Sequence, residues 1–235
     1  MNTINGRLPK ARSLAVPSLD NGDRMSQPEF HRRYLDYPND VKFELIGRTV
    51  YQASRPRWSH GTYTSKLIFV LGLFDAGTPG VEAATNTTTI LGEESEVQPD
   101  ADLRILPECG GRSKLDADDY VEGPPELIGE VAYSSRAIDL HGKKGDYERA
   151  GVAEYLVLCV EEQELHWFDF ASRGVVTPNR QGILRSRVFP GLWIDGPALL
   201  ARDASRLAQV VQQGLASRAH AAFVKRLQAA RRKSS

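Results

Sequence analysis

The stretch PPELIGEVA, residues 124–132, decides how this sequence folds. Its apolar run over residues 127–132 is typical of a buried strand, and Glu130 interrupts that run. A single carboxylate in a buried strand costs free energy unless a positive charge or a metal ion meets it. Glu130 therefore either belongs to a polar site or is neutralised by a structural lysine or arginine.

The residues that follow indicate one source of such a positive charge. We expect a helix that Asp139 caps and that ends before Gly151. Residues four apart lie on one face of a helix, so Asp139, Lys143 and Tyr147 share a side. Lys143 can therefore point back toward Glu130. Its neighbour in the chain points about a quarter turn away and is the poorer candidate.

The remaining segments predict an alternation of strands and helices. We expect a helix over residues 27–37 opened by a capping box of Ser26 and Glu29, a hairpin of 41–45 and 49–52, and a buried, largely apolar helix over 62–76. Strands are expected at 81–84, 87–91, 97–106, 152–159 and 164–170, with a loop at 110–119 and an edge segment within 183–193. Residues 199–232 are expected to form one long, alanine-rich helix with a basic exposed face.

Length and composition indicate a single α/β domain with appendages. The chain has 235 residues, of which 41% are hydrophobic and 26% charged, enough for one substantial core. We expect a flexible leader over residues 1–25, a folded domain over 26–197 and a basic C-terminal helix or tail over 198–235. No apolar run is long enough to cross a membrane, and two cysteines without metal-site or disulfide spacing fit a cytoplasmic protein.

The distribution of charge is more informative than its total. Lysine plus arginine and aspartate plus glutamate each number 30, so the chain lacks the overall positive excess that would by itself indicate a nucleic-acid partner. Residues 92–130 hold twelve acids against three basic residues, whereas residues 201–235 hold eight basic residues against one acid. The basic tail is either a solvated helix face or a contact for DNA or a partner.

Three residues far apart in the sequence suit one chemistry. Asp100 stands at the start of a predicted strand and Glu130 within another, and two carboxylates at strand ends can hold a hard divalent cation. A lysine such as Lys143 can steady the water that attacks phosphorus. The order favours metal-dependent phosphodiester cleavage. Taken alone, Asp100 could start a turn after Pro99, and Lys143 could be a solvated helix residue.

Several motifs together resemble a known family. The segment PPELIGEV, followed by Asp139, Lys143, Tyr147 and AGVAEY at 150–155, resembles the signature of the Uma-type restriction endonucleases, a branch of the PD-(D/E)XK nuclease superfamily. The resemblance extends to FELIG at 43–47, His60, the Pro-Asp pair at 99–100 and FPGL at 189–192. It covers residues 28–196 in order and leaves the leader and the basic tail outside.

The resemblance implies a restriction-endonuclease-like fold, a central mixed sheet flanked by helices with the active site at one end of the sheet. It also implies that Asp100, Glu130 and the backbone carbonyl of Val131 bind Mg²⁺ or Mn²⁺. Glu44 is either an extra ligand or a solvent-facing strand residue. The superfamily lysine is replaced here by Ala132, so the resemblance assigns the ammonium to Lys143.

The activity implied is that of a Mg²⁺- or Mn²⁺-dependent endonuclease cleaving DNA, acting as a homodimer by analogy. His60 and Tyr147 are candidates for the cleft, with capping or core packing as the alternative for each. Two other classes of function stay open: a nuclease-fold protein that binds nucleic acid or a partner without cutting, and an interaction module whose working surface is the long C-terminal helix.

Overall fold

A computed structural model describes residues 18–38 and 41–234 of the chain. Most of the predicted leader lies outside the described residues, and the three domain boundaries stay predictions. The described end of the leader packs on the neighbouring hairpin, where Leu19 is buried and Arg24 forms a β-bridge with Thr49. Within the described ranges, none of the helices combines the length and the apolar character needed to cross a bilayer.

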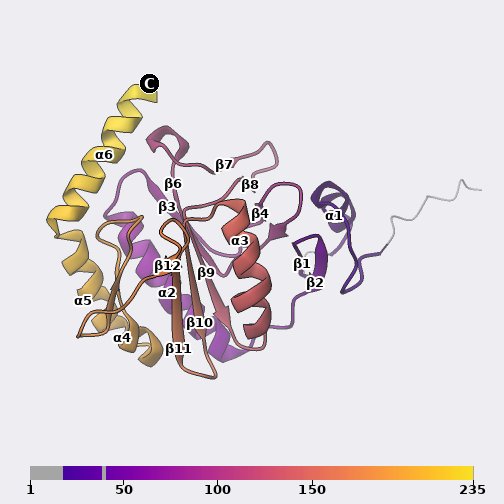
Figure 1. The fold of residues 1–235 in the computed structure, drawn as a ribbon, viewed down its shortest axis with the longest axis horizontal. Coiled ribbons are helices and arrows are strands. Elements are labelled where there is room, and N and C mark those ends of the chain that lie inside the picture. The colour runs from indigo at the N-terminus through magenta and orange to yellow at the C-terminus, as the bar shows by residue number, and fades with distance from the viewer. Residues whose placement is uncertain (1–17, 39–40, 235) are drawn as a thin grey trace, which may run out of the picture.

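A six-stranded mixed sheet forms the centre of the molecule, as predicted (Figure 1). Its order is β12-β11-β10-β9-β6-β3, and β9 pairs with β10 in parallel while the other pairs are antiparallel. The strands are β3 (Val81–Ala84), β6 (Ala101–Ile105), β9 (Leu127–Ala132), β10 (Glu154–Cys159), β11 (Glu164–Asp169) and β12 (Gly174–Val175). The apolar stretch around Glu130 is thus an inner strand of this sheet.

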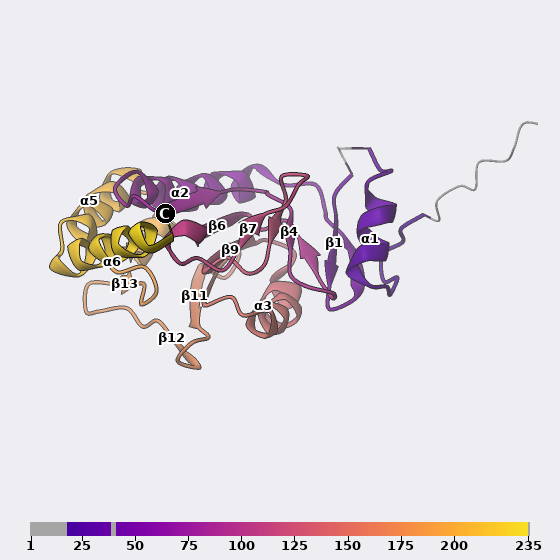
Figure 2. The same cartoon turned by 90° about the horizontal axis from the view of Figure 1, so that it is seen from above.

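Helices cover both faces of the sheet (Figure 2). Side chains alternate along a strand, so Leu127 and Val131 of β9 join the core cluster under α2 (Trp58–Ala76), while Ile128 and Ala132 join the cluster under α3 (Lys144–Ala150). Glu130 has the same parity as Ile128 and Ala132 and therefore faces the side of α3. The fold class predicted from the sequence is confirmed.

Helix α2 begins at Trp58, four residues before the predicted start, and ends at Ala76 before Gly77. Its buried positions include Leu67, Val70 and Leu71. The helix is not buried on every side as the sequence predicted, because Phe69 is exposed.

A second, smaller sheet lies beside the first, in the order β2-β1-β5-β4-β8-β7. Its strands are β1 (Phe43–Ile46), β2 (Thr49–Gln52), β4 (Thr89–Ile90), β5 (Glu96–Val97), β7 (Lys114–Leu115) and β8 (Val121–Glu122). The predicted strand over 97–106 is wrong as one element. It is split into β5 and β6 because Pro99 lacks the N–H that a ladder needs, and the chain changes sheet there. The predicted loop at 110–119 contains β7.

Two predicted helix caps are wrong. Helix α1 (Gln27–Tyr34) has Ser26 at its N-cap without a capping hydrogen bond, and Glu29 is occupied by ion pairs with Arg32 and Arg33. Asp139 lies inside a π-helical turn, η2 (Ile138–Lys143), that leads directly into α3. Its carboxylate accepts a hydrogen bond from Ser135 Oγ instead of capping backbone N–H groups.

The predicted single C-terminal helix is three helices: α4 (Gly196–Ala201), α5 (Ala204–Leu215) and α6 (Arg218–Ser234). Arg202 ends α4 in the left-handed conformation, with φ of 58°, and Asp203 caps α5 through the N–H of Arg206. The predicted edge segment is a separate hairpin, β13 (Ile183–Arg185) and β14 (Trp193–Asp195). The short 3₁₀ helix η1 (Pro107–Cys109) packs against α6.

Candidate active site

Glu130 carries its carboxylate into a buried polar cluster on the α3 side of β9. It is only 4% exposed. Its Oε1 accepts hydrogen bonds from Lys143 Nζ and from the Tyr147 hydroxyl, each at 2.9 Å. Of the partners expected for this carboxylate, a positive charge or a metal ion, Lys143 of η2 supplies the positive charge. In the described part of the chain, both side-chain hydrogen bonds that Glu130 accepts reach the same oxygen.

Lys143 lies between two glutamates from different sheets. Its Nζ is 2.9 Å from Glu130 Oε1 on the central sheet and 2.9 Å from Glu44 Oε2 on the smaller one, with Asp139 Oδ1 at 3.9 Å. The side chain is almost fully buried. Asp139 and Lys143 are four residues apart in this turn, close to one full turn, so both lie on its inner side and line the same cavity.

Asp100 lies where the chain passes from the smaller sheet to the central one. Its Oδ2 accepts the backbone N–H of Val131 at 2.8 Å and lies 3.2 Å from Nε2 of His60, near the start of α2. The backbone pairing of β6 with β9 ends at Gly129. Beyond it, the Asp100 side chain accepts the N–H of Val131 in place of a backbone carbonyl of β6. The hydrogen bond brings Asp100 to the residue that follows Glu130.

Glu44 is held in place by both of its oxygens. Oε1 accepts the backbone N–H of Gln98 at 2.8 Å and Lys143 Nζ at 3.2 Å, and Oε2 pairs with the same ammonium. Its carboxylate is therefore turned to Lys143.

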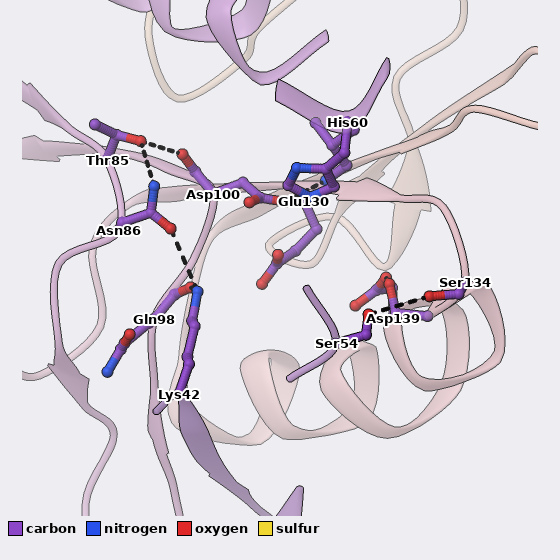
Figure 3. Close-up of polar contacts among 12 residues, drawn as sticks. Lys42, Ser54, His60, Thr85, Asn86, Gln98, Asp100, Glu130, Ser134 and Asp139 are labelled. Carbon is purple, nitrogen blue, oxygen red and sulfur yellow. Dashed lines mark hydrogen bonds and ion pairs between the residues drawn. The ribbon is translucent and has the colours of Figure 1, made fainter. Parts of the chain in front are cut away.

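These side chains line one cavity of about 480 Å³ between the two sheets. Of the residues expected at the site, the wall contains Glu44, His60, Asp100, Glu130, Val131 and Lys143. Tyr147 is not part of the wall: it is fully buried and touches the site only through its bond to Glu130. Figure 3 shows Asp100, Glu130 and His60 together, with Lys42 to one side and Ser54 and Ser134 to the other.

Burial and neighbouring charges set the protonation of the cluster. Burial raises the pKa of Glu130 to about 8; Asp100, Asp139 and Glu44 add to the rise, and Lys143 opposes it. Burial would lower the pKa of Lys143, but the three carboxylates around it hold that pKa well above its usual value.

Asp100 behaves differently from Glu130. Burial favours its neutral acid, but the hydrogen bond and charge of His60, together with the N–H of Val131, outweigh burial and lower the pKa of Asp100. At neutral pH the cavity therefore holds an ionised Asp100 and a protonated Lys143. Glu130 retains a proton for much of the time unless further positive charge arrives.

The donor set suits a hydrated hard cation. Mg²⁺ is commonly bound by one or two carboxylates and keeps several waters. Among residues 18–38 and 41–234, both side-chain contacts of Asp100 use Oδ2 and both of Glu130 use Oε1. This leaves Asp100 Oδ1 and Glu130 Oε2 as the oxygens available to a cation. Over residues 18–38 and 41–234, no three His, Cys, Asp or Glu side chains form a complete metal cage. The residues therefore fit an ion that keeps part of its water shell.

Sequence reasoning did not assign a site role to Asp139 or to the basic residues of the cavity rim. Asp139 lines the cavity, and so do Lys42, Arg55 and Arg57. The tripeptide Arg55-Pro56-Arg57, just before Trp58 and His60, was the signal that could have identified the rim.

Comparison with known proteins agrees with this geometry. A family model named Uma2, described as "Putative restriction endonuclease", matches residues 28–199, nearly three quarters of the chain. The chain belongs to the Uma2 family. No curated protein matches the sequence.

A solved structure shares the Uma2-type architecture described above. It is entitled a putative nuclease belonging to DUF820 from Anabaena variabilis ATCC 29413. The two chains are 12% identical and superimpose with a TM-score of 0.54 over 77% of this chain and 97% of the other. At this identity the likeness establishes the fold, and the matched nuclease family is the stronger evidence for the class of protein. The basic helix α6 lies outside the Uma2 match.

Proposed function

We propose that this Uma2 protein is a metal-dependent endonuclease that hydrolyses phosphodiester bonds of DNA. The observation that carries the proposal is the Lys143–Glu130 contact of 2.9 Å inside a cavity that Asp100 also lines. A structural ion pair alone would need neither a cavity of this size nor a second carboxylate facing it.

Asp100 and Glu130 would hold Mg²⁺ or Mn²⁺, with the carbonyl of Val131 as a further ligand. Such a cation, when bound, supplies Lewis-acid activation of the phosphoryl group and of water. Lys143, protonated throughout the neutral range, donates hydrogen bonds and offsets the negative charge that develops at phosphorus. Glu44 holds the ammonium in place from the opposite sheet, and His60 orients Asp100.

The rim of the cavity has the charge that a nucleic-acid backbone needs. Lys42, Arg55 and Arg57 line it, and no ion pair is found for any of the three within residues 18–38 and 41–234. Their charges are therefore available to phosphates, while the carboxylates lie deeper. Homodimerisation stays a prediction from the family resemblance.

The test is nicking of supercoiled plasmid DNA with Mn²⁺ or Mg²⁺. Glu130→Gln should lose activity by about 100-fold or more, since it removes the charge that holds the cation. The control Glu154→Gln makes the same change at a buried glutamate of the adjacent strand, outside the cavity, and should keep its activity. Equal nicking by the native chain and Glu130→Gln would sink the proposal.

A second candidate function is that of a nuclease-fold protein that binds without cutting. One observation favours it: the Lys143 ammonium already bridges Glu130 and Glu44 without a metal ion. In that case the purified native chain would bind DNA, and neither metal would produce nicking. Binding by both the native chain and Glu130→Gln, with no cleavage by either, would support this second function.

A further inference from the structure

The rim segment, residues 53–58, connects β2 to α2 and is exposed along its whole length. It ends in Trp58, which is 87% exposed. Tryptophan is rarely left so open to water, because its ring is the largest apolar side chain available for burial. The Trp58 side chain makes no hydrogen bond, ring contact or cation–π contact in the described ranges of the chain.

The position of Trp58 ties this ring to the candidate active site. Arg57, directly before Trp58, and His60, two residues after it, both line the cavity. His60 Nε2 lies 3.2 Å from Asp100 Oδ2. Trp58 itself is not part of the wall, so its exposed indole lies beside the cavity, next in the chain to Arg57, and not inside it. A polymeric ligand that runs from Asp100 out of the cavity past Arg57 can therefore reach this ring.

Two arginines precede the ring within three residues of the chain. Arg55 is exposed, and the guanidinium of Arg57 lies 4.9 Å above the ring centre of Tyr133 and donates to its hydroxyl at 3.3 Å. Trp58 is also the first residue of a 19-residue helix whose first turn contains no acid, so the N-terminal end of the helix dipole adds to the positive potential. Cations beside a flat, open aromatic ring are the combination that binds a phosphate backbone and stacks a base.

Duplex DNA offers its phosphates to such a rim but not the faces of its bases, because neighbouring base pairs cover those faces. An unpaired nucleotide exposes both. An indole ring at the rim therefore contributes to binding only where a base is out of the helical stack.

We propose, resting on the function proposed above, that Trp58 is a stacking platform for an unpaired base next to the scissile phosphate, and that the substrate class is single-stranded or locally unpaired DNA. Arg55 and Arg57 contact the phosphates on either side of that base. Trp58 is a specificity-determining residue in this proposal, and Asp100, Glu130 and Lys143 keep the roles given above.

The test compares binding of a fluorescently labelled single-stranded deoxyoligonucleotide with binding of the same sequence as a blunt duplex, in EDTA, by fluorescence anisotropy. Trp58→Ala should weaken single-strand binding by about tenfold or more and leave duplex binding unchanged. Trp58→Phe, which keeps a flat ring, should restore most of the affinity. Leu115→Ala, which truncates another exposed apolar side chain away from the cavity, should change neither.

A second readout reports on the ring itself. The chain has three tryptophans; Trp167 is buried and Trp193 is covered by the guanidinium of Arg185 at 4.0 Å. Single-stranded DNA should therefore quench indole fluorescence in the native chain, and this quenching should disappear in Trp58→Phe even though that variant still binds.

Three results would overturn the inference. The first is single-strand binding by Trp58→Ala that equals that of the native chain; the second is an equal loss on both DNA forms. The third is a native dimer that Trp58→Ala converts to monomer in sedimentation, which would show that Trp58 contacts a second copy of this chain instead of a base. If Glu130-dependent nicking persists alongside any of these, the proposed function stands and only the role of Trp58 falls. Trp58-dependent binding without Glu130-dependent cleavage would instead overturn the proposed function.

Discussion

A single ammonium group holds the two sheets together at the candidate site. Lys143, 5% exposed, pairs with Glu130 on the central sheet and with Glu44 on the smaller one. Removing one partner from a buried ion pair leaves an uncompensated charge, which costs more than the pair itself contributes. The next residue, Lys144, lies outside this cluster and places its Nζ 4.4 Å above the ring of Phe168. The two lysines therefore form a matched pair for mutation.

Lys143→Met should lower the free energy of unfolding by about 3–5 kcal/mol, because Glu130 and Glu44 are left without their cation. It should also reduce nicking by about 100-fold or more. Lys144→Met should cost about 1 kcal/mol or less and keep activity. Urea denaturation and plasmid nicking measure the two effects. The double variant Lys143→Met with Glu130→Gln should regain part of the lost stability but not activity, because Glu44 stays without its cation. Equal stability losses for the two single lysine variants would contradict this account.

At the scale of elements, strand β10 carries a buried glutamate with a structural task. Glu154 Oε2 accepts from Ser186 Oγ at 2.7 Å, and Oε1 accepts from the backbone N–H groups of Arg187 and Val188 at 2.7 and 3.2 Å. These bonds tie the start of β10 to the segment that follows β13. Burial raises the pKa of Glu154 above its ordinary value, and the same bonds only partly offset that rise.

A raised folded-state pKa makes the contribution of Glu154 to stability depend on pH. The contribution is fully present below the ordinary pKa of 4.5 and is lost as the pH rises through the folded-state value. Glu154→Gln removes this titration. The unfolding free energy of the native chain, relative to Glu154→Gln, should therefore fall as the pH rises above about 4.5. Urea denaturation of both chains across this range measures it, and a constant difference between them would refute the assignment.

At the scale of the whole molecule, the C-terminal helices complete the main core. Phe223 of α6 and residues of α5 join the cluster around α2, and the ring of Phe223 meets that of Phe189 edge-on, with centroids 6.1 Å apart. Helix α6 lies at the end of the molecule away from α1 (Figure 1) and is outside the Uma2 match. Its basic outer face remains a candidate contact for DNA or a partner, while its inner face is structural.

Deleting residues 201–235 would remove core side chains together with the basic face of α6. Point variants are therefore needed to separate the structural role of α6 from a binding role. Phe223→Ala should lower the free energy of unfolding by about 3–5 kcal/mol, because a large buried ring leaves a cavity. Lys225→Ala, on the exposed side of the same helix, should change it by about 0.5 kcal/mol or less. Thermal or urea unfolding measures both. A small cost for Phe223→Ala would show that α6 adds little to the fold.

The sequence by itself determined the strands β9 and β3, the hairpin of β1 and β2, and the meeting of Lys143 with Glu130, because periodicity and helical spacing are local properties. It misplaced the strand over 97–106 and the single C-terminal helix. The strand break at Pro99 and the helix end at Arg202 depend on tertiary packing around these residues, which the local sequence does not show. The family resemblance named Glu44 and His60 as site candidates, each with a structural alternative. Only the tertiary structure placed both in the same cavity as Asp100 and put a basic rim ending in Trp58 beside it, since these contacts join segments that no local pattern relates.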